Sequence, residues 1–248
     1  MGIAAFSLAK KKILITGASS GIGRAIAIAC SEMEASVLIT GRNEEELNNT
    51  LKLLKGSGHL AFKADLTVES DVDILANSMP ELDGFISNAG INKRMLVKYL
   101  KTDEMARVLN TNLTSPIYLT KKLLKLKRIK EGGSIVYISS IAVFQTSIGN
   151  GIYSATKGGL SSFSKVLALE LAGKRIRVNT IQPGMVHTGL MNNGPLSNED
   201  YEKDKKNYPL GRYGMPDDIA YLAVYLQSNQ SAWMTGTDLV IDGGRSLI

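Results

Sequence analysis

The sequence predicts an α/β fold made of one domain, residues 1–248, with a doubly wound sheet of about seven parallel strands and helices on both faces. Short apolar runs alternate with longer helical patterns along the chain, which is typical of βαβ units. A glycine-rich turn follows the first of these runs, and neither an internal repeat nor a linker-like stretch divides the chain. With 44% hydrophobic residues, the chain can bury one large core.

The strands are expected in short runs, several of which are β-branched and apolar throughout. Strands that helices cover on both faces have this pattern, because neither face meets water. The seven runs are Ile13–Thr16, Val37–Thr40, Ala61–Ala64, Gly84–Ser87, Ile135–Ser139, Arg177–Ile181 and Leu239–Ile241.

Helical patterns occupy the intervals between these runs. One segment, Thr188–Gly211, departs from the alternation because it carries Gly, Asn, Pro and Lys without a clear strand. It is either a substrate lid or an ordinary surface excursion, and we predict a lid. The helices are expected at Gly21–Ser31, Glu44–Lys55, Ser70–Ser78, Asp103–Lys127, Tyr153–Ala172 and Pro216–Gln227.

Composition excludes several classes of protein. No apolar stretch reaches the roughly 18 to 20 residues that span a bilayer, so no membrane segment is expected. The N-terminus places an apolar patch before three lysines, which is the reverse of a secretory signal. The only cysteine, Cys30, can form no internal disulfide, and we expect it to be buried on the first helix. These features predict a cytoplasmic protein.

The net charge of +6 is moderate, and much of it lies in residues 121–130. Cations suit the C-terminal end of a helix, so we expect this run to be a solvated helix end. A docking patch for an acidic partner is the alternative. No aromatic residue is interleaved to stack on bases, so nucleic acid is not an expected partner.

The glycine-rich turn reads Gly17-Ala-Ser-Ser-Gly21-Ile-Gly23 and leads into the first helix. Its glycines permit a tight turn and let the backbone approach a pyrophosphate, which the N–H groups at the helix N-terminus would bind. The turn therefore predicts a Rossmann-type dinucleotide cradle, although its spacing differs from the common G-x-G-x-x-G pattern. The expected cofactor contacts in the turn are Gly17, Ser19, Ser20, Gly21, Ile22 and Gly23.

The end of the second strand predicts which cofactor binds. An acidic residue near this point would bind the 2′-hydroxyl of the adenosine ribose of NAD(H). Gly41 supplies no carboxylate, and Arg42 offers a planar, permanently charged group that suits a 2′-phosphate. Ser19, Ser20 and Asn43 could add hydrogen bonds. We therefore predict NADP(H).

Tyr153 and Lys157 stand four residues apart on a predicted helix and therefore share one face. We expect the lysine charge to bring the tyrosine pKa down from about 10 toward the working pH, where a general acid is most effective. Ser140, at the end of the fifth strand, can polarise the same substrate oxygen. Tyr153 and Ser140 are the expected substrate contacts, and no metal site is expected. The pattern predicts hydride transfer between a nicotinamide and a carbonyl or alcohol.

Each of these patterns alone has a structural explanation. A tyrosine at a helix start is commonly a packing residue, Y-x-x-x-K pairs occur by chance, and Ser-Ser after a strand is often a turn. Here the three patterns occur together, downstream of a nucleotide cradle and near the carboxyl ends of strands. Ligands of open α/β sheets bind at that edge, so the catalytic interpretation is favoured.

With Thr16 before the glycine turn, the chain resembles the short-chain dehydrogenase/reductase family over about residues 11–244. The resemblance implies that Asp65 and its neighbour hold the adenine and that small residues after the fourth strand admit the ribose. Ser87 stands where the family usually has Asn. The further cofactor contacts that the family implies are Asp65, Leu66, Asn88, Ala89, Gly90, Tyr153, Lys157, Pro183, Gly184, Val186 and Thr188.

The same resemblance completes the catalytic set. Asn112 matches the family's catalytic asparagine, which holds a water in a proton relay from the lysine. Backbone at Val186 and the hydroxyl of Thr188 would bind the carboxamide of the nicotinamide. His187 is not expected to be catalytic, because Tyr153 already supplies the acid. The catalytic residues are therefore expected to be Asn112, Ser140, Tyr153 and Lys157.

The C-terminal stretch from Pro209 to Gly244 is similar to the 3-oxoacyl-[acyl-carrier-protein] reductase branch of the family. That branch also contains enzymes for small ketones, sugars and polyols, so these substrates remain alternatives. A nucleotide-sensing regulator on the same fold is the non-enzyme alternative. The fatty-acid enzymes carry two basic positions for docking the acidic carrier. This chain has Glu131 at one and Lys174 at the other, so a carrier-bound ketone and a small ketone both remain open.

The family also implies an assembly. Its two long helices and its last strand contact partner copies. Here the two long predicted helices carry apolar residues beyond one stripe, and we predict a homotetramer of two-fold pairs. Examples of these residues are Leu119, Leu123, Leu160 and Phe163.

Overall fold

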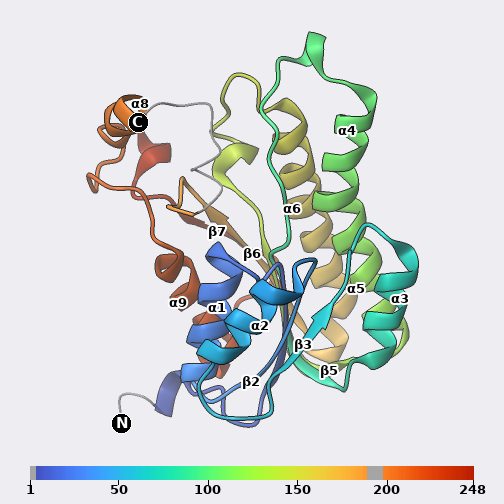
Figure 1. Cartoon of the computed structure of the whole chain (residues 1–248). Helices are drawn as coiled ribbons and strands as arrows, with labels where there is room; N and C mark the ends of the chain where they lie inside the picture. Colours follow the sequence, from blue (N-terminus) through green and yellow to red (C-terminus); the bar gives the residue numbers. More distant parts are fainter. Residues whose placement is uncertain (1–3, 189–197) are drawn as a thin grey trace.

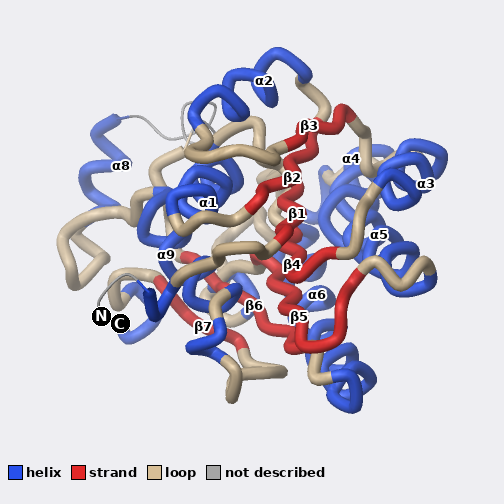
Figure 2. The backbone as a smooth tube through the Cα atoms, turned by 90° about the horizontal axis from the view of Figure 1, so that it is seen from below, coloured by secondary structure: helices blue, strands red, loops and turns tan. Residues whose placement is uncertain are grey.

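A computed structural model of the chain describes residues 4–188 and 198–248. Seven strands form one parallel sheet in the order β3-β2-β1-β4-β5-β6-β7, as Figures 1 and 2 show. Helices cover both faces, so the predicted fold class is confirmed. The strands are β1 Lys12–Thr16, β2 Ser36–Gly41, β3 Leu60–Lys63, β4 Leu82–Ser87, β5 Ile129–Ile138, β6 Arg177–Pro183 and β7 Asp238–Ile241.

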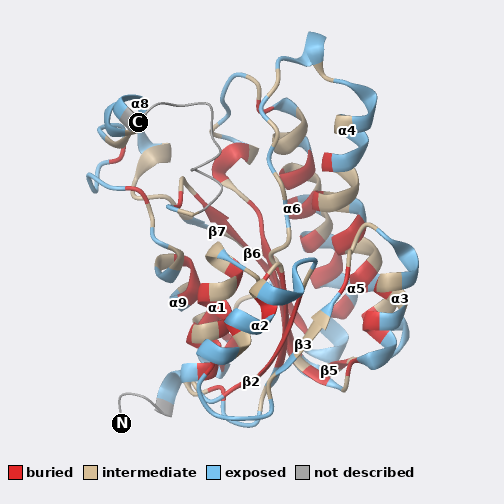
Figure 3. Ribbon diagram, viewed as in Figure 1, coloured by how far each residue is buried: buried red, intermediate tan, exposed pale blue. Residues whose placement is uncertain are grey.

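The helices divide between the two faces of the sheet, and each face has its own apolar core (Figure 3). α1, α2 and α9 cover one face, where Ile13 and Ile15 of β1 point. α3, α5 and α6 cover the other, where Leu14 points. Successive residues of β1 are therefore buried on opposite faces, which explains why the run is apolar throughout. The helices are α1 Gly21–Glu32, α2 Glu44–Leu53, α3 Glu69–Ser78, α4 Thr102–Leu109, α5 Ser115–Lys125, α6 Gly151–Leu171, α8 Asn198–Lys205 and α9 Pro216–Gln227.

The strand order reverses between β1 and β4, since the chain adds β2 and β3 on one side and β5 to β7 on the other. In open α/β sheets, ligands bind at the carboxyl ends of strands beside such a reversal. β1, β4 and β5 end at this edge with Thr16, Ser87 and Ile138. The predicted glycine turn and Ser140 directly follow two of these strand ends.

The predicted helix Asp103–Lys127 is interrupted. α4 and α5 are joined by η3, a π-helical turn over Asn110–Thr114, in which Ser115 N–H donates to Asn110 O. Pro116 explains why a continuous helix is disfavoured, because it lacks the N–H that an α-helix would give to the carbonyl of Asn112. The π turn is rare and is often found at functional sites.

We cited four apolar residues as examples of side chains that could contact a partner copy, and for three of them this prediction is wrong. Leu119, Leu123 and Leu160 are almost fully buried within this chain's own core. Phe163 also packs against that core and is only partly buried. The exposed apolar side chains of α6 are instead Val166 and Leu169.

The predicted lid, residues 188–211, falls partly outside the described residues, since 189–197 are not described. Its described part contains α8, where no helix was expected. Tyr208 and Tyr213 follow α8 and pack edge to face, with ring centroids 5.1 Å apart. In the part of the chain that the structure describes, no helix is both long and apolar enough to cross a membrane.

Candidate active site

The glycine turn between β1 and α1 is closely packed against the end of β4. A Cβ atom at Gly23 would lie 2.3 Å from the Gly17 carbonyl oxygen, and a Cβ atom at Gly17 would lie 2.8 Å from Ala89 Cα. Real Cβ atoms essentially never approach so closely. Gly17 also has φ of +65°, a conformation that favours glycine. The turn therefore requires both glycines.

Thr16 and Asn88 join the ends of β1 and β4 by reciprocal hydrogen bonds. Asn88 Nδ2 donates to the carbonyl oxygens of Thr16 and Gly17, each at 3.1 Å. Thr16 Oγ1 accepts from Asn88 N at 3.0 Å and from Ala89 N at 3.1 Å. The side chain of Asn88, a predicted cofactor contact, is thus used to shape the cradle.

Arg24 holds the outer side of the turn, a role that the sequence reasoning missed. Its guanidinium donates to Ser19 O and to Thr50 Oγ1, the latter at 3.0 Å. It also pairs with Glu46 Oε2 of α2 at 2.5 Å. The signal was available, because Arg24 directly follows Gly23 in the first turn of α1.

The end of β2 can accept a side chain at Gly41. A Cβ atom at Gly41 would make only ordinary contacts, at 3.5 Å or more. Arg42 is exposed and, among the described residues, makes no hydrogen bond or ion pair. The expectation that Asn43 adds a hydrogen bond to the cofactor is weakened, because Asn43 Oδ1 caps α2 by accepting from Glu46 N at 3.1 Å.

Asp65 follows β3 near Arg42. Thr67 donates to Asp65 Oδ1 from its backbone N at 2.9 Å and from its hydroxyl at 2.7 Å. Burial alone would raise the pKa of Asp65, but these hydrogen bonds and the charge of Arg42 hold it below its usual value. The carboxylate is therefore ionised and can accept a hydrogen bond.

Tyr153, Lys157 and Ser140 meet where α6 begins and β5 ends. The side chain of Ser140 lies close enough to the Tyr153 hydroxyl to lower its pKa. Lys157 Nζ lies 5.7 Å from the centroid of the Tyr153 ring and donates to Ile138 O at 2.7 Å. The structure thus brings the three predicted residues together at the carboxyl edge of the sheet.

The expected lowering of the Tyr153 pKa is wrong. Burial raises the pKa of Tyr153, and the Ser140 side chain only partly opposes this effect. Burial also lowers the pKa of Lys157 to about 8. The lysine is only 4% exposed, and its charge is directed to the Ile138 carbonyl, which explains the weak effect on the tyrosine.

Asn112 lies in the π turn and is fully buried. Its Oδ1 accepts from Ile91 N and its Nδ2 donates to Ile91 O, both at 2.8 Å. The same Nδ2 reaches Thr156 Oγ1 at 3.3 Å. Both ends of the amide are therefore used to hold the loop after β4 against α6.

Gly90 shows that Asn112 and Lys157 lie close together. A Cβ atom at Gly90 would be 3.3 Å from Asn112 Oδ1 and 3.5 Å from Lys157 Nζ. A larger residue at this position would press on both side chains. The predicted catalytic residues and the loop after β4 therefore share one site.

The segment after β6 returns over the start of α1. Gly184 is needed there, because its Cβ would lie 2.9 Å from Asp242 Cβ. Val186 forms an isolated parallel bridge with Gly214. Thr188 Cγ2 would lie 3.3 Å from a Cβ atom at Gly21, so the two ends of the predicted cofactor site meet.

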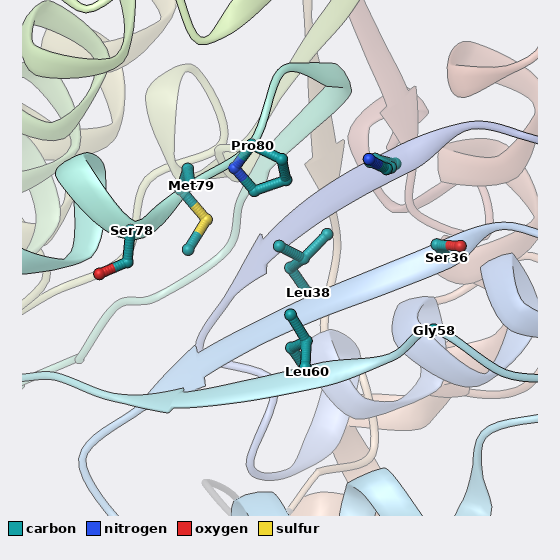
Figure 4. Close-up of a pocket in the computed structure, with 8 residues that line it drawn as sticks. Ser36, Leu38, Gly58, Leu60, Ser78, Met79 and Pro80 are labelled. Carbon is teal, nitrogen blue, oxygen red and sulfur yellow. The ribbon is translucent and has the colours of Figure 1, made fainter.

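Two features lie away from this site, at the amino end of the sheet: the pair of predicted docking positions and a surface depression. Glu131 is near the start of β5, and Lys174 follows the C-terminus of α6. A depression of about 450 Å³ also lies at that end, lined by Leu38, Leu60 and Met79 among others (Figure 4). Neither feature adjoins Tyr153. No cluster of three potential metal ligands occurs in residues 4–188 and 198–248.

A glycine cradle facing a Ser-Tyr-Lys group at the reversal of a parallel sheet defines a dinucleotide-dependent oxidoreductase. The family model described as enoyl-(acyl carrier protein) reductase matches residues 17–246. The chain belongs to this family, the short-chain dehydrogenases/reductases.

Curated relatives match nearly the whole chain. The 3-oxoacyl-[acyl-carrier-protein] reductase of Mus musculus is 38% identical over 241 residues, which cover 96% of this chain and 98% of that protein. The enzyme of the same name from Chlamydia pneumoniae is 34% identical over 245 residues, with coverage of 96% and 98%.

Solved structures match equally well. A variant of actinorhodin polyketide ketoreductase, crystallised with NADPH, superposes with a TM-score of 0.89 at 31% identity and covers 96% of this chain and 98% of its own. An Agrobacterium tumefaciens protein with bound NADP, provisionally assigned as a 2-deoxy-D-gluconate 3-dehydrogenase, gives 0.88 at 30% identity, with coverage of 98% and 99%.

Proposed function

We propose that the protein is an NADPH-dependent reductase of 3-oxoacyl thioesters, which converts the 3-oxo group to a 3-hydroxyl group. The observation that carries this proposal is the grouping of Ser140, Tyr153 and Lys157 at one site, opposite the glycine turn. The reductases named among the relatives support the substrate class.

The residues of the cradle fit NADP(H). The first turn of α1 has no side-chain cap among the described residues, so its backbone N–H groups can face an anion. Arg42 forms no ion pair within the described part of the chain and directly follows Gly41. When bound, the cofactor supplies the hydride to the substrate carbonyl carbon. The adenine would be held at Asp65 and Leu66, and the nicotinamide between Pro183 and Thr188.

We assign the proton chemistry to this chain's own side chains. Ser140 and Tyr153 each direct a hydroxyl toward one substrate oxygen, and two donors stabilise the negative charge that develops there. The raised pKa of Tyr153 keeps its proton available until that oxygen becomes basic. Lys157 lies next to Tyr153 and can return a proton to it. Both ends of the Asn112 side-chain amide are already hydrogen-bonded to the backbone of Ile91. A water in the proton relay would therefore be bound by backbone atoms rather than by the Asn112 side chain.

Docking of an acyl carrier would involve a second copy of this chain. Lys174 follows the C-terminus of α6, whereas Tyr153 lies near its N-terminus, so about 30 Å of helix separates them. Glu131 replaces the other basic position. A reductase of a small ketone, sugar or polyol is therefore the second candidate, and the sugar dehydrogenase assignment of one structural neighbour favours it. Reduction of an enoyl thioester, which the family model's description names, is a third.

We also propose a homotetramer and a cytoplasmic location. The exposed apolar residues of α6 and the unpaired edge of β7 support the assembly. A single buried thiol, Cys30, fits a reducing compartment. The lid over residues 188–211 stays a prediction.

The function is tested by following NADPH consumption with acetoacetyl, crotonyl and keto-sugar substrates. Reduction of the acetoacetyl thioester at the highest kcat/KM supports the proposal. A higher value for the keto-sugar or for the crotonyl thioester would replace it with the second or third candidate. Absence of turnover on every substrate, with NADPH still bound, would favour a nucleotide-sensing regulator.

The assignment of the acid has its own test. Tyr153→Phe removes one hydroxyl and should lower kcat by about 100-fold or more, because general acid catalysis is typically worth 10²–10⁴-fold. NADPH affinity, measured by fluorescence titration, should change little. A variant that keeps more than about a tenth of the wild-type rate would contradict the role of Tyr153.

A further inference from the structure

Two loops flank the first turn of α6 and are bonded to each other. One, residues 88–101, leads from β4 to α4, and the other, residues 141–150, leads from β5 to α6. We call them the entrance loops. Arg94 on the first loop donates from Nη2 to Ser147 Oγ on the second, at 3.0 Å. A cation is thus held across the junction of the two loops.

The entrance loops pack on the start of the catalytic helix. Met95 N donates to Gly149 O at 2.8 Å, and Val97 Cγ2 would lie 3.6 Å from a Cβ atom at Gly151. Ser147 precedes Tyr153 by only six residues, so the two lie within about 20 Å of each other even if the chain were extended. The guanidinium of Arg94 therefore lies beside the loop that leads into the helix carrying Tyr153.

All the charged side chains on the entrance loops are positive. Residues 88–101 contain four cations and no acid, and residues 141–150 contain no charged residue. Lys93 is paired with Glu104 at 2.8 Å, and Lys98 lies over the ring of Tyr99. Within the described part of the chain, Arg94 bonds only to the neutral Ser147. The hydrogen bond to Ser147 orients the charge of Arg94, and no acidic side chain among the described residues forms an ion pair with it.

Apolar side chains accompany this cation. Val97, Phe144 and Ile148 are 77%, 50% and 87% exposed, respectively, and all three stand on the entrance loops. Exposed large apolar residues grouped at one place often mark a binding surface. A basic group with apolar neighbours suits an elongated substrate that is apolar along its length and anionic at a distance from the ketone.

We infer that Arg94 determines substrate specificity by binding an anionic group on the arm that carries the ketone, and that the arm is a pantetheine thioester whose phosphate reaches the entrance loops. This inference rests on the proposed function and names its substrate class more closely. The phosphate is common to coenzyme A and to the prosthetic arm of an acyl carrier protein. Arginine suits it, because its planar fork can donate two parallel hydrogen bonds to phosphate oxygens.

The inference is tested with three thioesters that present the same acetoacetyl group. Acetoacetyl-coenzyme A and the acetoacetyl-loaded carrier protein carry the phosphate, and the N-acetylcysteamine thioester is neutral. Arg94→Gln should lower kcat/KM for coenzyme A and carrier thioesters by about tenfold relative to the neutral thioester, the scale of one charge-assisted hydrogen bond. The salt sensitivity of the coenzyme A reaction should fall in the same variant.

Lys98→Gln is the matched control, since it removes the same charge from the same loop without breaking the contact with Ser147. It should leave the ratio of the three substrates near the wild-type value. An equal decrease on all three thioesters in Arg94→Gln would overturn the inference, because it indicates a structural role. A decrease confined to the carrier thioester would also overturn it, in favour of contact with the carrier surface. Failure of the wild type on all thioesters would instead contradict the proposed function itself.

Discussion

At the scale of single residues, burial shifts the pKa values of Tyr153 and Lys157 in opposite directions. Both shifts favour the uncharged form of the side chain. The pKa of Tyr153 is raised, whereas the pKa of Lys157 is lowered to about 8. A neutral tyrosine keeps the proton that a ketone reductase must give. A lysine that titrates near 8 can gain and lose a proton within the working range of pH. The pair therefore suits proton delivery, although the pKa of Tyr153 is raised rather than lowered as the sequence suggested.

The lowered pKa of Lys157 makes stability depend on pH. Between about pH 8 and 10.5 the unfolded lysine is protonated and the folded one is neutral, so the unfolded state binds more protons and stability rises with pH. Relative to Lys157→Met, the wild-type free energy of unfolding should rise by about 1 to 3 kcal/mol across this interval. Urea titrations at several pH values measure it. A difference that stays constant with pH would show that Lys157 keeps an ordinary pKa in the folded protein.

At the scale of elements, we expect the junction of β2 and α2 to select between the two nicotinamide cofactors. Gly41 ends β2 where a side chain could be added without a clash, and Arg42 follows without a hydrogen bond among the described residues. An aspartate fits at position 41, since a Cβ atom there meets nothing closer than 3.5 Å. Its carboxylate would attract a ribose 2′-hydroxyl and repel a 2′-phosphate.

We expect the wild-type protein to prefer NADPH by roughly tenfold to a few hundredfold in kcat/KM, because charge-assisted hydrogen bonds contribute about 1.5 to 3 kcal/mol each and Arg42 is exposed. The double change Gly41→Asp and Arg42→Gln should move the preference toward NADH. Steady-state kinetics with both cofactors measure the ratio. Equal values in the wild-type protein would show that Arg42 does not recognise the phosphate.

The elements also show what the sequence predicts well. Runs that are apolar throughout, such as β1 and β2, were found within one or two residues of their expected ends. β5 begins six residues earlier than expected, because Ile129 pairs with Leu82 of β4 ahead of a register shift, and residues 130–133 lie between that pair and the pairing of Ser134 with Gly84. The π turn escaped prediction because it depends on Pro116 and on the contact of Asn112 with Ile91, which joins residues far apart in sequence. The catalytic trio was predictable because its spacing is local to one helix and one strand end.

At the scale of the whole molecule, the sheet that the described residues form ends in two edge strands, β3 and β7, and several large apolar side chains are exposed. β7 has a neighbour on one side only, and Val166 and Leu169 project from α6 with 56% and 80% of their surface exposed. Trp233, which precedes β7, is fully exposed. Large exposed apolar residues beside an edge strand and on a nearby helix are expected to be covered by partner copies.

The predicted tetramer is tested by light scattering at micromolar concentration, with Trp233, the only tryptophan, as an internal probe. Assembly that covers the last strand should shift its fluorescence to shorter wavelength than in the dilute protein. Leu169→Glu should reduce the mass by at least half, because it places a charge in an apolar contact. Ile74→Glu, on the exposed face of α3, is the control and should leave the mass unchanged. A monomer in the unmodified protein would refute the assembly.

The π turn between α4 and α5 has a consequence for the length of the chain. Each residue of an α-helix advances about 100° around the axis, so losing one residue from 110–114 would rotate everything on one side of the gap by that angle. Leu119 and Leu123 would then leave the core, or Asn112 would leave Ile91. In this turn the number of residues matters as much as their identity, because it sets how α5 is rotated relative to α4. Insertions and deletions that surface loops tolerate should therefore disrupt the fold at residues 110–114. This should hold even at a position where a substitution is tolerated.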